Sequence, residues 1–318
     1  MDGPNSIRSR SICPWQLRTR TLELGRRTLI MGVVNITPDS FSDGGSFLAP
    51  EAAIAQAVQL LDEGADLLDL GAESTRPGSR VRVNIGQESA AAVTTEEEQA
   101  RLLPVLEGIG AARPNVVLSI DTYKAATARA ALAAGAEIIN DVSGFTWDPA
   151  LPAVCAESRC GVILMHTRGR PEEWRTQPQL DPEILIATVR DGLSASLATA
   201  ASAGIASESI LLDPGYGFGK RFKENFTLLA RQQELLALGR PLLAGLSRKS
   251  FLGHALAPLY AGQPAPVNAR ETASIAALVV AILHGASIVR LHNVRPAVEA
   301  ARIADAILNA TRMLGAPS

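Results

Sequence analysis

Short apolar segments alternate with helix-like stretches along most of the chain. There are eight such segments, centred on residues 29–35, 67–71, 116–121, 137–140, 161–166, 210–213, 242–246 and 287–291. Longer stretches with helical character lie between most of them, for example 51–63, 96–109, 123–134, 183–203 and 270–284. Continuous apolar strands that alternate with helices are typical of a parallel sheet that is covered on both faces.

The junctions between these segments repeat one pattern. Gly64, Gly135 and Gly285 each follow an Ala/Leu-rich stretch and precede an apolar segment that ends in a polar residue. Glycine suits the left-handed residue that ends many helices. Eight such units in 318 residues predict an α/β fold with a single (β/α)8 TIM barrel. A doubly wound open sheet is the alternative, but no G-x-G-x-x-G motif follows the first strand.

The pattern also divides the chain into regions. Residues 1–11 are predicted to be a disordered tail, and residues 12–27 a short N-terminal hairpin or plug. The remainder, 28–318, is predicted to form the barrel. Segment 79–95 is polar and rich in small residues, so we interpret it as an insertion in the second strand-to-helix loop.

Composition narrows the possible functions. A formal charge of −2 gives no sign of binding to nucleic acid or to a membrane surface. The longest apolar run, 273–283, is too short to span a bilayer. Three cysteines, Cys13, Cys155 and Cys160, make neither a disulfide framework nor a plausible zinc site. We therefore expect a cytoplasmic protein.

Every predicted strand ends in polar residues, more consistently than helix capping requires. Because the carboxyl ends of barrel strands converge on one mouth, these residues are expected to lie together. We expect acids and amides on one side of the mouth and cations on the other. In chain order the residues are Asn35, Asp69 with Glu73, Asp121, Asn140 with Asp141, His166, Asp213, Ser247, and Arg290 with His292.

Four loops that follow strands add candidate chemistry. The loop 35–45, N-I-T-P-D-S-F-S-D-G-G, suits a ligand-covering lid, although an ordinary connection fits about as well. The turn 73–78, E-S-T-R-P-G, carries an Arg that can hold a phosphate or a carboxylate. The loop 213–220, D-P-G-Y-G-F-G-K, combines an acid with aromatics and suits a flat heterocycle with N–H donors. The stretch 247–250, S-R-K-S, opens a short helix and suits an anion.

Taken together, these motifs closely resemble those of the dihydropteroate synthases of bacterial folate synthesis. The resemblance covers residues 28–310 and adds S-I-D-T at 119–122, I-I-N-D at 138–141, L-M-H at 164–166 and R-x-H at 290–292 to the four loops. It implies a pterin-binding transferase on the same TIM barrel. The implied reaction joins 6-hydroxymethyl-7,8-dihydropterin diphosphate to 4-aminobenzoate, with Mg2+ as cofactor. The products are 7,8-dihydropteroate and diphosphate, and the substitution is dissociative.

The resemblance also implies roles for individual residues. The implied catalytic residues are Asp43, Arg76, Asp121, Asp213 and Lys249. The implied Mg2+ ligand is Asn35. The implied substrate-binding residues, which overlap with these, are Asn35, Phe41, Thr75, Arg76, Pro77, Asp121, Asn140, Met165, Asp213, Phe218, Gly245, Lys249, Ser250, Arg290 and His292.

Within this set the resemblance assigns subsites. Asp121, Asn140, Asp213 and Lys249 are expected around the pterin, with Met165 and Phe218 packed nearby. Arg290, His292 and Asn35 are expected at the diphosphate. The two loops that carry Phe41, Asp43, Thr75, Arg76 and Pro77 are expected to shape the aminobenzoate pocket, and Ser250 to face its carboxylate.

Two other functions remain open: a pterin-binding methyltransferase barrel and a non-catalytic pterin-binding paralogue. The cationic motifs argue against both, because neither needs an apparatus for an anionic leaving group. The resemblance further implies a homodimer, for which 271–284 is a candidate interface, and sensitivity to sulfonamides.

Overall fold

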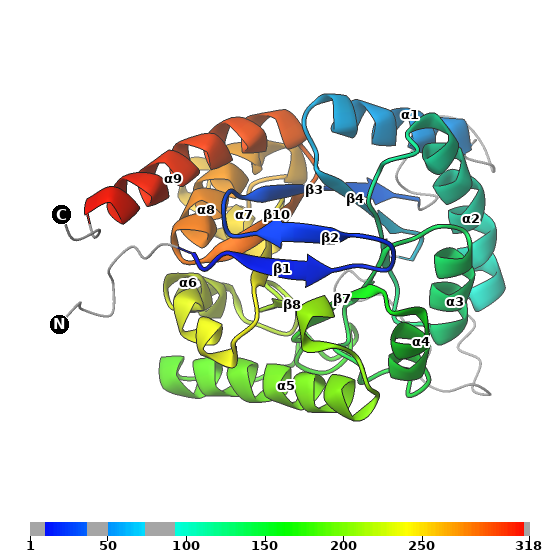
Figure 1. Cartoon of the computed structure of the whole chain (residues 1–318). Coiled ribbons are helices and arrows are strands. Elements are labelled where there is room, and N and C mark those ends of the chain that lie inside the picture. The colour runs from blue at the N-terminus through cyan, green and yellow to red at the C-terminus, as the bar shows by residue number, and fades with distance from the viewer. Residues whose placement is uncertain (1–9, 37–49, 74–92, 315–318) are drawn as a thin grey trace.

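The computed structural model describes residues 10–36, 50–73 and 93–314, which form a closed parallel barrel ringed by helices (Figure 1). The barrel order is β10-β3-β4-β5-β6-β7-β8-β9. Its strands are β3 (Leu29–Asn35), β4 (Leu67–Gly71), β5 (Leu118–Asp121), β6 (Ile138–Asp141), β7 (Gly161–Met165), β8 (Ile210–Asp213), β9 (Leu242–Gly245) and β10 (Ala286–Leu291). The predicted TIM barrel is confirmed, and the open-sheet alternative is wrong because β10 pairs with β3.

Helices follow the strands and cover the outer face of the barrel. They are α1 (Pro50–Asp62), α2 (Thr95–Ala112), α3 (Ala125–Ala133), α4 (Leu151–Ser158), α5 (Pro182–Ser202), α6 (Phe222–Ala230), α7 (Ser250–Ala255), α8 (Glu271–Leu283) and α9 (Val294–Leu314). Short 3₁₀ helices, η2 to η5, cover Ser207–Ser209, Gln232–Leu238, Ala257–Leu259 and Val267–Ala269.

The barrel strands are apolar on both faces because both faces are covered. Strand β4 is buried at every position, and so is β7. Outward-pointing side chains join the helices in one large core, and inward-pointing ones fill the barrel. Most of the polar side chains that face the barrel therefore lie at or near the carboxyl ends of the strands, and the buried Asp69 within β4 is an exception.

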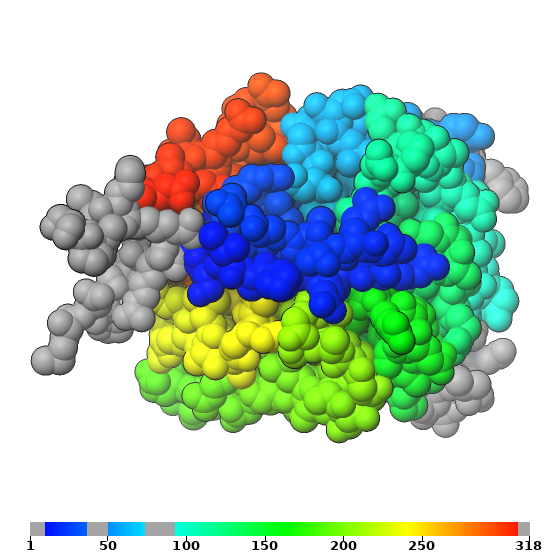
Figure 2. Space-filling model, in the orientation of Figure 1, coloured from blue at the N-terminus to red at the C-terminus, as the bar shows by residue number. Residues whose placement is uncertain are grey.

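A hairpin closes the end of the barrel opposite the strands' carboxyl ends. Strands β1 (Cys13–Gln16) and β2 (Thr21–Leu24) pair antiparallel, as predicted, and lie across the barrel (Figures 1 and 2). Trp15 is fully buried in the inner core, against side chains from the first halves of the strands. Its indole Nε1 donates to the Ser209 carbonyl at 2.9 Å. The hairpin is thus the plug of the barrel.

Two predicted boundaries are sharpened at the ends of the described ranges. Of the predicted disordered tail, residues 1–9 lie outside the described residues, while Arg10 is buried. Arg10 donates to Thr28 and to the Ala286 carbonyl and pairs with Asp305 of α9. Most of the predicted insertion 79–95 also lies outside the described residues, but Thr94 already caps α2.

Within the described ranges, one helix is long and apolar enough to cross a membrane by length and composition alone. It is α5, which packs against β7 as one of the barrel's covering helices. A covering helix of this kind passes such a test without crossing any bilayer, so the finding is weak support for a membrane span.

Because Trp15 anchors the hairpin in the barrel core, we expect the stability of the whole fold to depend on this residue. Trp15→Ala removes a fully buried indole and its hydrogen bond, so we expect the free energy of unfolding to fall by about 3–5 kcal/mol in chemical denaturation. Gln16→Ala, on the exposed side of the same strand, is the control and is expected to change it by less than about 0.5 kcal/mol. Equal stability of the two variants would contradict the role of Trp15 as the plug.

Candidate functional site

An ion network fills the centre of the barrel mouth. Arg290, near the end of β10, donates from Nε to Asp69 Oδ2 at 2.5 Å and from Nη2 to Asp121 Oδ2 at 2.8 Å. Asp69 lies on β4 and is fully buried, whereas the Asp121 side chain at the end of β5 is partly exposed. Three strands therefore contribute one charge each to a single cluster.

Asp69 also organises the neighbouring polar side chains. Its carboxylate accepts from Ser119 Oγ at 2.6 Å and from Asn140 Nδ2 at 3.0 Å. Sequence reasoning placed Asp69 at a strand end but assigned it no role in the site. The available signal was an acid within the apolar strand Leu67–Gly71, since a buried carboxylate needs donors.

Asp213 stands beside this network, at the end of β8. Its Oδ1 accepts from the Gly215 amide at 2.7 Å. Gly245, at the end of β9, lies between Asp213 and Arg290: it is in register with Arg290, and a Cβ at this position would lie 3.8 Å from Asp213 Oδ2. The glycine therefore leaves open space beside the carboxylate.

One wall of the mouth combines aromatics with a lysine. The Lys249 Nζ lies 3.9 Å from the centre of the Phe218 ring. Phe218 in turn meets Trp174 edge-on, with ring centres 5.0 Å apart, and joins an apolar cluster that includes Met165. This wall matches the predicted grouping of Met165, Phe218 and Lys249.

The rim carries further predicted residues. Asn35 ends β3 and is partly exposed, and Ser250 opens α7 and is exposed. His292 follows β10, and its Nδ1 lies 3.0 Å from Ser247 Oγ. Arg248, next to Ser247, turns away from the mouth and pairs with Glu271 of α8 at 3.5 Å.

Four charged groups in the mouth have shifted pKa values. Burial raises the pKa of Asp121 to about 7, against the opposing charge of Arg290. Burial also raises the pKa of Asp213, against the Gly215 amide and Lys249. Burial lowers the pKa of Lys249 to about 8, although Asp213 works in the other direction. Burial also lowers the pKa of Arg290. The charges of Asp69 and Asp121 outweigh this effect and raise the pKa of Arg290 above its ordinary value.

The predicted separation of acids from cations is wrong. Arg290 was expected on a cationic side with His292, but its guanidinium lies between two carboxylates. The physical reason is that a guanidinium largely withdrawn from water needs acidic partners.

Three polar strand-end residues serve the fold instead of the mouth. Glu73 pairs with Lys124 at 2.8 Å. The Asp141 carboxylate accepts from the amides of Ser143 and Phe145 and so caps the turn after β6. The His166 ring packs against Gly192 of α5.

Five predicted site residues, Phe41, Asp43, Thr75, Arg76 and Pro77, lie outside the described residues.

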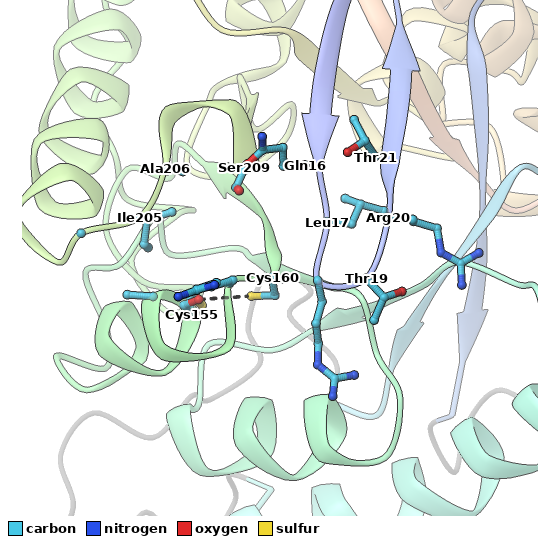
Figure 3. A pocket seen from close by; sticks show the side chains of 14 residues that line it. Gln16, Leu17, Thr19, Arg20, Thr21, Cys155, Cys160, Ile205, Ala206 and Ser209 are labelled. Carbon is cyan, nitrogen blue, oxygen red and sulfur yellow. Dashed lines mark hydrogen bonds between the residues drawn. The ribbon is translucent and has the colours of Figure 1, made fainter.

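A cavity of about 410 Å³ lies on the opposite face, between the hairpin and the ends of α4 and α5 (Figure 3). Its lining includes Arg18, Arg20 and Arg159, but also Cys160 and Ser209, which directly precede β7 and β8. The lining also includes residues just after the carboxyl ends of two helices, where the partial negative charge opposes an anion. The cavity is therefore separate from the mouth and lacks its chemistry.

Comparison with known proteins gives this mouth a family. A family model described as "Pterin binding enzyme" matches residues 31–292. A dihydropteroate synthase of Synechocystis is 41% identical over 283 residues, which cover 89% of this chain and 91% of the relative. The chain belongs to the dihydropteroate synthase family.

Solved structures of dihydropteroate synthases agree with this assignment. The enzyme from Xanthomonas albilineans with 4-aminobenzoic acid matches with a TM-score of 0.80 and 38% identity, over 96% of this chain and all of that one (100%). The same enzyme in complex with 7,8-dihydropteroate matches with a TM-score of 0.77 and 36% identity, again over 96% and 100% of the two chains. The predicted fold, family and enzyme class are confirmed.

We expect the stability of the protein to depend on Asp69, which pairs with Arg290. Asp69→Asn keeps the shape but leaves Arg290 with one carboxylate, so we expect about 2–4 kcal/mol less stability in chemical denaturation. The control, Asp62→Asn, breaks an exposed pair with Arg113 and is expected to cost less than about 0.5 kcal/mol. A loss as small as that of the control would show that the network does not depend on Asp69.

Proposed function

We propose that this chain condenses 6-hydroxymethyl-7,8-dihydropterin diphosphate with 4-aminobenzoate to give 7,8-dihydropteroate and diphosphate. One observation carries the proposal. Within the described residues, Asp121, Asp213 and Asn140 each keep one side-chain oxygen that accepts no hydrogen bond from the protein. Three such acceptors at the carboxyl ends of β5, β6 and β8 suit a flat ring with several N–H donors.

The ligands of the relatives support the same substrates. One solved structure of the Xanthomonas albilineans enzyme contains 4-aminobenzoic acid and another contains 7,8-dihydropteroate, which are the acceptor and the product of the proposed reaction. We extend both ligands to this chain because its mouth supplies acceptors for the pterin and cations for an anionic leaving group.

The substitution is proposed to be dissociative. As the bond to the diphosphate breaks, positive charge develops on the pterin methylene, and the carboxylates of Asp121 and Asp213 stabilise it. The Lys249 ammonium lies over the Phe218 ring, and its pKa is affected by the charges of Asp121 and Asp213. Arg290 and His292 are proposed to hold the departing diphosphate. The amine of 4-aminobenzoate then attacks the methylene carbon and loses a proton.

The remaining assignments concern the aminobenzoate. Ser250, exposed at the start of α7, is proposed to face its carboxylate. Asp43, Arg76, Phe41, Thr75 and Pro77 are proposed to complete this pocket, on the strength of the motifs alone.

Mg2+ is proposed as the cofactor, with Asn35 as its protein ligand. Among the described residues no group of three His, Cys, Asp or Glu side chains could hold a metal. Asn35 lies at the end of β3, and its side-chain oxygen accepts no hydrogen bond from the described residues. A single oxygen ligand fits an ion that keeps most of its waters and binds through substrate phosphates. When bound, Mg2+ would neutralise charge on the diphosphate.

A homodimer and a cytoplasmic location also remain proposals. Exposed aromatic side chains on α6, Phe222 and Phe226, and the exposed Val280 on α8 offer an apolar surface for a second copy. Cys13, Cys155 and Cys160 are all free thiols, which suits a reducing compartment.

A diphosphate-release assay tests the reaction. The wild-type protein with both substrates and Mg2+ is expected to release diphosphate. Asp213→Ala is expected to weaken binding of the pterin diphosphate at least about a hundredfold, because the ring donors lose a buried acceptor. Binding is measured by calorimetry.

The same assay separates the alternatives. A non-catalytic paralogue would bind the pterin without releasing diphosphate, and a methyltransferase barrel would release none from this substrate. Unchanged affinity in Asp213→Ala would contradict the proposed role of that carboxylate.

The pH dependence of pterin binding follows from the groups in the mouth whose pKa values are shifted. Asp121 must be ionised to accept from the ring, so affinity for 6-hydroxymethylpterin should rise as pH increases through about 7. It should fall again at higher pH, where the buried lysines Lys220 and Lys249 lose their protons. This pterin carries no phosphate, so phosphate titration does not interfere. Asp121→Asn should remove the acidic limb alone; an unchanged limb would assign it to another group.

A further inference from the structure

Lys220 is a buried cation that the proposed reaction does not use. Its side chain is 6% exposed, and its ammonium donates to three backbone carbonyls: Gly215 at 2.8 Å, His166 at 3.1 Å and Phe218 at 3.3 Å. No carboxylate of the described residues pairs with it within ion-pair distance. An ammonium has three N–H donors, and all three are matched here by carbonyl oxygens.

These carbonyls belong to two neighbouring strand ends. His166 directly follows β7, while Gly215 and Phe218 lie in the loop that follows β8. The two segments are packed closely: a Cβ on Gly215 would lie 1.9 Å from the His166 carbonyl oxygen, and one on Gly219 would lie 2.6 Å from the Arg168 carbonyl oxygen. Both glycines also have positive φ angles, +71° and +70°. Only glycine allows this approach, and Lys220 holds the segments together.

The loop that Lys220 holds carries the aromatic wall of the mouth. Phe218 supplies one of the three carbonyls, and its ring lies under Lys249 and against Trp174. Met165, the residue before His166, belongs to the same apolar cluster. Asp213 opens the loop and faces the mouth. Fixing these backbone positions therefore fixes the groups expected around the pterin.

We infer that Lys220 is a positioning residue for the pterin subsite, which it shapes by binding the carbonyls of His166, Gly215 and Phe218. This inference rests on the proposed function. Lys220 is not a catalytic residue, because its ammonium is occupied by the backbone and is buried behind the loop.

It costs free energy to keep Lys220 charged at this buried position. Burial lowers the pKa of Lys220 to about 7; the Asp213 carboxylate opposes this shift, as does Glu224, while Arg168 and Lys249 add to it. A buried cation without an ion pair is expensive to keep. An apolar side chain of similar length would avoid that cost but would leave three carbonyls without donors.

Replacement of Lys220 by Met tests the inference. The Kd of 6-hydroxymethylpterin, measured by calorimetry, is expected to rise at least about tenfold in Lys220→Met. In steady-state kinetics the KM for pterin diphosphate should rise, while the KM for 4-aminobenzoate at saturating pterin diphosphate should not change. Lys223→Met, three residues further on at the exposed start of α6, is the control and should match the wild type.

A second variant keeps the test decisive. Lys220→Gln retains N–H donors without the charge and should bind the pterin with an affinity between those of Lys220→Met and the wild type. Wild-type affinity in a folded Lys220→Met protein, or equal rises in both KM values, would overturn the inference. Failure of both variants to fold, judged by circular dichroism, would assign Lys220 to the fold and overturn it as well. If the wild type itself does not bind the pterin, the proposed function fails first, and the two failures are thereby distinguished.

Discussion

The mouth of this barrel depends on the pairing of Arg290 with Asp69 and Asp121. An unpaired charge at this depth would cost several kcal/mol, so each of the three groups requires the others. Their strands, β10, β4 and β5, are distant in sequence, and only closure of the sheet between β10 and β3 brings Arg290 to the acids. Asp69 then fixes Asn140 and Ser119 as well. Barrel closure and site geometry are in this sense one constraint.

Much of the fold was predictable because the apolar runs are long and clearly bounded. The predicted ranges 29–35, 67–71 and 210–213 coincide with β3, β4 and β8. What the pattern could not tell is which of two adjacent polar residues faces the barrel. At the end of β6 both faces are buried, so Asn140 and Asp141 look alike in sequence. In the structure Asn140 turns inward to Asp69, and Asp141 turns outward to cap a turn.

The cationic residues show the same limit. The run from Ser247 to Ser250 suggested one anion site, but it divides in space. Arg248 has a positive φ of 58°, which no sequence rule demands of an arginine, and it points to Glu271. Lys249 turns inward over Phe218 instead. Residues 37–49 and 74–92 lie outside the described part of the chain, so the roles assigned to their motifs stay predictions.

The charges in the mouth also bear on how the proposed reaction would proceed. When ionised, the carboxylates of Asp69, Asp121 and Asp213 outnumber the cations Arg290 and Lys249 by one, which favours a ring that becomes positive. Arg290 neutralises part of that field by lying between two of the acids. In the proposed reaction, a diphosphate that shared the Arg290 guanidinium would weaken its hold on Asp121, and the freed carboxylate would be a better acceptor for the pterin. Departure of the diphosphate toward Arg290 and stabilisation of the cation by Asp121 would then reinforce each other, because both draw on the same ion pair.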